Sequence, residues 1–137
     1  MSNRGWFPVR RSILDDPHWL GRPFTKGQAK VDLAMLAEYE EREVTAKGGK
    51  KIQLRRGQLF TSIRWLAARW GWHPTTVVRF LDVLAKNKED LYAIERVAVR
   101  ESKLNPKENP EALGTKITFV NYDVLHNTGL TLPEDMQ

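Results

Sequence analysis

Residues 62–87, SIRWLAARWGWHPTTVVRFLDVLAKN, decide the fold of this chain. Ser62 is a suitable N-cap for a first helix, and Gly71 supplies the positive φ angle that ends that helix. His73 then takes the cap position of a second helix, and Pro74 fits its first turn, where a missing N–H costs nothing. The pattern predicts two helices joined by a tight turn, which is the arrangement of a helix-turn-helix.

Both predicted helices are amphipathic, because apolar residues recur three and four positions apart. The apolar positions are Ile63, Leu66, Ala67 and Trp70 in the first helix, and Val77, Phe80, Leu81 and Leu84 in the second. We expect these residues to form the core, with Trp72 at the corner between the helices. The positions left outside this face are Arg64, Ala68 and Arg69 in the first helix, and Thr75, Thr76, Arg79, Asp82 and Lys86 in the second.

Length and composition limit the class of protein. A chain of 137 residues suffices for one domain with a single core, here expected at residues 1–125, followed by a frayed tail at 126–137. The absence of Cys excludes disulfides, Cys-ligated zinc and thiol catalysis. No apolar stretch approaches the roughly 20 residues that cross a bilayer, and the N-terminus lacks the apolar segment of a signal peptide. We therefore expect a cytoplasmic, nucleoid-associated protein with no membrane partner.

Positive charge is concentrated around the predicted helix pair. Residues 50–100 contain 11 Lys or Arg against 4 Asp or Glu, whereas residues 31–49 contain 2 against 5 and residues 101–137 contain 3 against 6. A basic segment that coincides with a helix-turn-helix is the electrostatic pattern expected for phosphate contact. A solvated basic surface is the alternative reading.

The remaining elements are predicted from shorter patterns. Asp16-Pro17 favours a helix or turn start, and Thr25 can cap a longer helix that ends near Glu43. Residues 52–54 and 58–61 read as short extended segments around a Gly bend. After the second helix, two strands are expected at 92–100 and 116–120, the first with Ile94, Val97 and Val99 pointing inward.

The second predicted helix supplies the candidate DNA contacts. Recognition helices meet base edges with their N-terminal residues, and Arg can bond guanine O6 and N7 together. Phosphate contacts are expected around it, on the first helix and on the two following strands. The candidate DNA-binding residues are Thr75, Thr76, Arg79, His73, Lys86, Arg64, Arg69, Arg96, Arg100 and Lys103. The alternatives are that Arg79 pairs with Asp82 or Glu89, that Asp82 pairs with Lys86, and that His73 is only a cap.

Trp65 lies outside the apolar face of the first predicted helix. It either packs against the N-terminal helix or the strands, or it stays exposed as a protein-contact residue or a platform for an unpaired base.

The sequence offers no pattern for catalysis, so we expect no enzyme, no cofactor and no metal. The three His residues stand in unlike segments without metal-ligand spacing. Neither a Gly-rich phosphate loop nor a Gly-x-Ser-x-Gly nucleophile turn is present.

Several local patterns together resemble one family. The patterns are Gly5-Trp6, the run from Arg11 to Asp15 with Pro17, Arg56-Gly57-Gln58 with Phe60-Thr61-Ser62, Gly71 with Thr76-Val77, and the run from Ile117 to Asp123. Taken in order along the chain, they resemble the N-terminal domain of phage replisome organisers and DnaD-type primosomal proteins. The resemblance implies an α+β winged helix-turn-helix, with additional N-terminal helices and a two-stranded wing.

The resemblance also implies a function. It predicts a phage- or prophage-encoded protein that binds double-stranded DNA during replication initiation, with a helicase loader among its candidate partners and a homodimer as a candidate assembly. The nearest alternative is a stand-alone transcriptional regulator of phage genes. An alternative of another class is a protein-interaction module, or a phage inhibitor of a host enzyme, that does not bind DNA.

Overall fold

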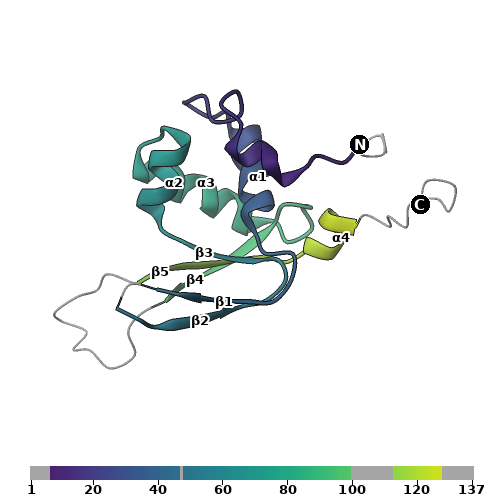
Figure 1. The fold of residues 1–137 in the computed structure, drawn as a ribbon. Coiled ribbons are helices and arrows are strands. Elements are labelled where there is room, and N and C mark those ends of the chain that lie inside the picture. Colours follow the sequence, from purple (N-terminus) through teal and green to yellow (C-terminus); the bar gives the residue numbers. More distant parts are fainter. Residues whose placement is uncertain (1–6, 47, 100–112, 128–137) are drawn as a thin grey trace, which may run out of the picture.

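The computed structural model describes residues 7–46, 48–99 and 113–127. In this part of the chain, four α-helices and a short 3-10 helix combine with two small antiparallel sheets, so the protein is α+β (Figure 1). The elements are, in chain order, η1 (Arg11–Asp15), α1 (Lys26–Leu36), β1 (Arg42–Thr45), β2 (Lys51–Leu54), β3 (Gln58–Thr61), α2 (Ile63–Trp70), α3 (Pro74–Lys86), β4 (Ile94–Val99), β5 (Gly114–Phe119) and α4 (Tyr122–Asn127). Among the described residues, no helix is long and apolar enough to cross a membrane.

A three-stranded sheet lies in the middle of the molecule. Its strand order is β3-β5-β4, and β4 pairs with β5 from Ile94 opposite Phe119 to Val99 opposite Gly114. Figure 1 shows α1, α2 and α3 on one side of this sheet and the β1–β2 hairpin on the other. Successive strand residues face opposite sides, so Leu59 packs with the helices and Phe60 with the hairpin.

The main core lies between the helices and the sheet. Leu66, Val77 and Leu81 are fully buried, and so is Trp70. The Trp70 ring meets the Phe80 ring edge to face, with centroids 5.7 Å apart, which is a favoured aromatic geometry. The apolar faces predicted for residues 63–70 and 74–86 are therefore confirmed.

The ends of the helices follow the predicted capping pattern. Ser62 Oγ accepts a hydrogen bond from the Trp65 N–H at 3.0 Å, and Thr25 Oγ1 accepts one from the Gln28 N–H at 3.1 Å. Gly71 ends α2 with a φ of 71°, in the left-handed region that favours glycine. These local signals explain why the boundaries of α2 and α3 can be predicted from sequence.

The predicted helix from Thr25 to Glu43 is wrong in its second half. The helix ends at Leu36, the Glu38 N–H donates to the Gln58 carbonyl at 2.9 Å, and the segment from Arg42 onward forms β1. The reason is tertiary, because the β1–β2 hairpin buries Ile52 and Leu54 and covers the lower face of the sheet.

The predicted inward position of Val97 is also wrong. Side chains alternate along a strand, so Val97 cannot share a face with Ile94. Ile94 is fully buried beside the helices, whereas Val97 is 66% exposed. Val99 lies on the same face as Val97 and packs near the hairpin.

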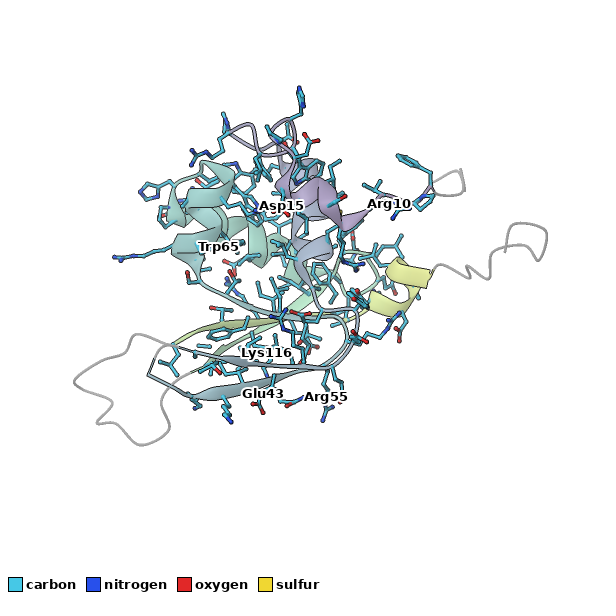
Figure 2. All side chains as sticks on the ribbon, viewed as in Figure 1. Arg10, Asp15, Glu43, Arg55, Trp65 and Lys116 are labelled. Carbon is cyan, nitrogen blue, oxygen red and sulfur yellow. The ribbon has the colours of Figure 1, made fainter. Side chains whose placement is uncertain are left out.

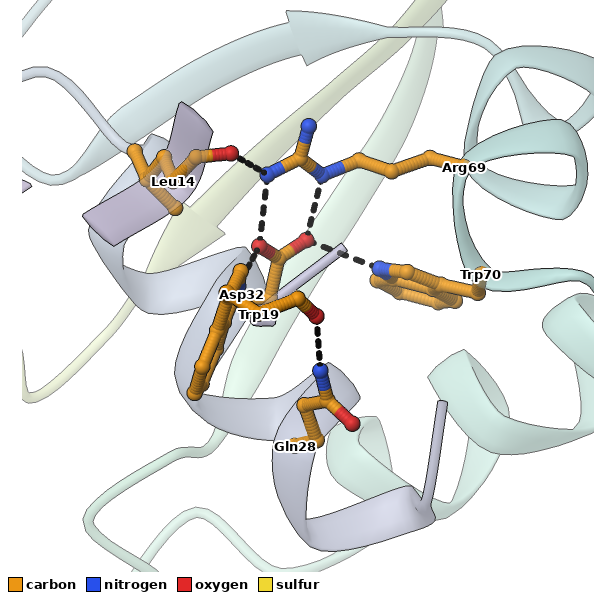
Figure 3. A network of polar contacts seen from close by, with 6 residues as sticks. All are labelled: Leu14, Trp19, Gln28, Asp32, Arg69 and Trp70. Atoms are coloured by element: carbon orange, nitrogen blue, oxygen red, sulfur yellow. Dashed lines mark hydrogen bonds and ion pairs between the residues drawn. The ribbon is translucent and has the colours of Figure 1, made fainter. Parts of the chain in front are cut away.

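A buried carboxylate joins the N-terminal segment to the helices. Asp32 on α1 is fully buried, and it accepts hydrogen bonds of 2.8 Å from the indole N–H groups of Trp19 and Trp70 (Figure 3). The Arg69 guanidinium forks onto both carboxylate oxygens, also at 2.8 Å, and donates a further bond to the Leu14 carbonyl at 3.1 Å. These hydrogen bonds with Asp32 raise the pKa of Arg69. The predicted outward position of Arg69 is therefore wrong, because a buried charge needs a paired partner.

Replacing this carboxylate tests its importance. We expect Asp32→Asn to lower the free energy of unfolding by about 3–5 kcal/mol, because Arg69 loses its buried counter-ion. The control Asp123→Asn removes an ion pair whose carboxylate is 79% exposed, and such a pair contributes at most about 1 kcal/mol. Urea denaturation of both variants measures the difference, and equal losses would contradict the assignment.

Two arginines hold α4 against the rest of the domain. Arg11 Nη2 donates to the Tyr122 hydroxyl at 3.1 Å, and Arg56 lies 5.2 Å from the centroid of the Tyr122 ring. Burial raises the pKa of Tyr122, although both arginines act in the opposite direction. Gly57 packs so closely below this ring that an added Cβ would lie 2.7 Å from Tyr122 Cβ.

Two glycines provide a matched test of this close packing. Gly57 and Gly49 have φ angles of 85° and 87°, but a Cβ on Gly49 meets nothing within 4 Å. We expect Gly49→Ala to cost about 1–2 kcal/mol through left-handed strain. Gly57→Ala should cost about 1–3 kcal/mol more through overpacking against Tyr122. Thermal or urea unfolding compares the two, and similar stabilities would argue against tight docking of α4.

Candidate nucleic-acid interface

Helix α3 presents one polar face to solvent. Thr75, Arg79, Asp82 and Lys86 are spaced four, three and four residues apart, so they form one stripe along the helix, and all four are exposed. The opposite face is the buried one that packs against α2. Thr76 lies beside the stripe and is half-buried.

Two cations on this stripe are unpaired. Within the described residues, neither Arg79 nor Lys86 has an ion pair or a side-chain hydrogen bond. The alternative in which Arg79 pairs with Asp82 or Glu89 is therefore not observed. Lys86 lies in the last turn of α3, where a positive charge also interacts favourably with the helix dipole.

The carboxylate on the stripe is neutralised from the neighbouring strand. Asp82 forms an ion pair with Arg96 on β4 and not with Lys86 as considered from the sequence. Arg96 is the more buried partner, with 27% of its side chain exposed against 52% for Asp82. The pair removes a repulsive charge from the stripe and ties α3 to the β4–β5 hairpin.

The N-terminus of α3 is capped by an unusual residue. His73 Nδ1 accepts a hydrogen bond from the Thr75 N–H at 3.1 Å. The bond uses the lone pair of Nδ1, so Nε2 is the ring atom left to donate outward. His73 is exposed, which makes both of its considered roles compatible with this geometry.

The other predicted contacts divide into three groups. Arg64 is exposed on α2 and has no ion pair among the described residues. Arg69 is committed to Asp32 and is not available to a ligand. Arg100 and Lys103 lie outside the described residues.

Packing adds two basic residues that the sequence patterns missed. Arg22 Nη1 donates to the Ala68 carbonyl at 2.9 Å, and its side chain lies against Gly71 at the turn between α2 and α3. Lys26 Nζ lies 6.0 Å from the Trp72 ring centroid. Both residues precede the turn by more than 40 positions, so no local periodicity could have linked them to it.

Trp65 lies outside this basic surface. It is 48% exposed on α2, and the Arg69 guanidinium lies 5.5 Å from its ring centroid. It lines the same pocket as Leu36 on α1 and Val44 on β1, and it belongs to neither buried core cluster, so of the two alternatives considered for Trp65 the geometry favours exposure.

The described residues contain no group of three or more His, Asp or Glu side chains placed to hold a metal ion.

No family model matches the chain, and no match was found among curated proteins or among solved structures.

The His73 cap can be tested by its effect on stability. We expect His73→Ala to lower the free energy of unfolding by about 1 kcal/mol, because the Thr75 N–H loses its acceptor. His73→Asn should retain or exceed native stability, since Asn is a preferred N-cap residue. Chemical denaturation of the two variants measures this, and equal destabilisation by both would contradict a capping role.

Proposed function

We propose that this protein binds double-stranded DNA as a winged helix-turn-helix module. In this proposal α2 and α3 form the helix-turn-helix, and the β4–β5 hairpin is the wing. Support comes from the element order β3-α2-α3-β4-β5, from the Gly71 turn, and from the pairing of the hairpin with β3 in one sheet.

The exposed stripe of α3 is the observation that carries the proposal. Arg79 and Lys86 are long cations without partners in the described part of the chain, and they stand on a helix that is held by a buried apolar face. A rigid helix with free cations on its outer face can approach phosphates and base edges in a major groove.

Each residue then has a distinct role. Thr75 and Thr76 at the N-terminal end of α3 contact a phosphate or a thymine methyl group, and Arg79 reads guanine through O6 and N7. Lys86, Arg64 and the Nε2 atom of His73 contact backbone phosphates.

Arg22 and Lys26 extend this phosphate-contacting surface past the turn between the helices. Arg100 and Lys103 belong to the proposed wing contacts, and Arg96 acts through its pairing with Asp82 to hold the wing beside α3.

The biological setting is proposed from the resemblance to phage replisome organisers and DnaD-type proteins. It places the protein in phage or prophage replication, near the nucleoid, with a helicase loader as a partner. As a homodimer it would bind two half-sites about one helical turn apart.

A double charge reversal tests DNA binding. We expect Arg79→Glu with Lys86→Glu to weaken binding to duplex DNA about 100-fold or more, because two contacts are replaced by repulsion. The dependence of log affinity on log salt should also become shallower, by about 0.9 for each lost phosphate contact. Fluorescence anisotropy with a labelled duplex at several salt concentrations measures both quantities.

The control makes the same change in net charge elsewhere. Lys51 and Arg55 are exposed on or beside β2, so Lys51→Glu with Arg55→Glu should leave most of the affinity intact. Equal losses in the two double variants, or no binding of the native protein at low salt, would overturn the proposal.

A further inference from the structure

An apolar groove of about 390 Å3 runs beside β3, away from the α3 stripe. The helices form one wall with Leu36 and Trp65, and the β1–β2 hairpin forms the other with Val44 and Leu54. Figure 2 shows Trp65 and Glu43 on opposite sides of the three-stranded sheet, in keeping with two walls from two layers. The groove and the α3 stripe share no residue.

The strand between these walls has an open edge. Among the strands that the structure describes, β3 is terminal in its sheet and pairs with β5 on one side alone. The Gly57 carbonyl accepts a bond from Phe119 of the β5 strand, whereas the Gln58 carbonyl faces the other way and accepts the Glu38 N–H. Along a strand, the backbone groups of successive residues point alternately to its two edges. The N–H and C=O of Phe60, two residues after Gln58, therefore point to the open edge, where the groove lies.

A half-exposed aromatic ring stands at this edge. Trp65 is held by the Arg69 guanidinium, and Arg69 is itself fixed by the buried carboxylate of Asp32. This contact limits the orientations open to the ring before a ligand arrives, which lowers the entropic cost of binding. Exposed, rigidly held tryptophans are characteristic of the residues that dominate protein–protein affinity.

An acidic segment begins at one end of the groove. The segment 38–43 has the sequence EYEERE, with four Glu and one Arg, and its first residue, Glu38, lines the groove. Glu38 pairs with Arg42 and Glu43 with Lys51, which leaves Glu40 and Glu41 exposed and without ion pairs among the described residues. This charge repels nucleic acid and attracts a basic ligand.

We propose that the groove binds an extended, basic peptide segment of a partner protein, which adds a strand to the open edge of β3. The peptide backbone pairs with Phe60, an apolar side chain of the peptide packs against Trp65, and its Lys or Arg residues lie beside Glu40 and Glu41. Main-chain pairing at a strand edge combined with side-chain pockets is an established mode of peptide recognition. This inference does not depend on DNA binding.

A designed peptide tests the proposal. In antiparallel pairing with β3, the C-terminal end of the peptide lies toward Glu38, so the probe is the peptide VTVTVKK and its counterpart is VTVTVEE. Titration of each into the ¹⁵N-labelled full chain should shift the amide signals of Phe60 and Ser62 and the indole signal of Trp65. We expect VTVTVKK to bind at least tenfold more tightly than VTVTVEE.

Matched variants locate the site. Trp65→Ala should weaken binding of VTVTVKK about tenfold or more, because a hot-spot aromatic is lost. The control Val97→Ala removes a 66% exposed apolar side chain from β4, the other terminal strand, and should leave the affinity unchanged. Glu40→Lys with Glu41→Lys, two exposed positions away from the core, should abolish the preference for the basic peptide.

Several outcomes would overturn the proposal. They are shifts confined to β4 amides, equal affinity for the two peptides, and full binding by the Trp65→Ala variant. A free protein that is already dimeric, with Phe60 and Ser62 amides protected from hydrogen exchange without peptide, would show that a second copy of the chain occupies the edge. Shifts of the α3 amides by VTVTVKK would also contradict a separate groove.

Discussion

The carboxylate of Asp32 connects the parts of this molecule that carry its exposed surfaces. Its two oxygens accept four hydrogen bonds from Trp19, Arg69 and Trp70, so a charge that would be costly to bury is fully paired. It bonds to Trp70, whose ring contacts those of Trp72 and Phe80 at the α2–α3 turn, and to Arg69, whose guanidinium contacts Trp65. Both the proposed DNA-contacting stripe and the proposed peptide groove are therefore held by one buried ion pair.

The two surfaces are opposite in charge although they belong to one small domain. The α3 stripe has Arg79 and Lys86, which have no ion pair within the described residues, whereas the acidic segment beside the groove has Glu40 and Glu41. The net charge of +5 is the sum over both surfaces and does not reveal this difference between them. If both proposals hold, the two ligands do not compete for one surface, because each surface repels the ligand of the other.

Sequence predicted the parts of the fold that depend on neighbours along the chain. The apolar periodicity of α2 and α3, the Ser62 cap and the Gly71 turn are local, and all were predicted correctly. The hairpin strand β1 was missed, because residues 37–43 resemble a helix end until Gln58 pairs with Glu38.

The role of Arg69 was missed because its partner lies 37 positions away. The sequence does contain one sign of a buried partner for Arg69. Asp32 lies three residues after Ala29, on the face of α1 that is buried, and a charge on such a face needs a partner. For the candidate site, the outer face of α3 followed from periodicity, whereas the pairing of Asp82 with Arg96 required the sheet.

The indole contacts have a spectroscopic consequence. Four tryptophans lie in the described residues, and three of them, Trp19, Trp70 and Trp72, donate their N–H groups to fixed acceptors in partly or fully buried sites. Trp65 donates to no acceptor within the described residues and is half-exposed to water. Its emission is thus the component of these four that polar solvent shifts to the red and that iodide quenches most readily. The unmodified protein already contains a fluorophore beside the groove, and its accessibility to a quencher reports whether that groove is open or filled.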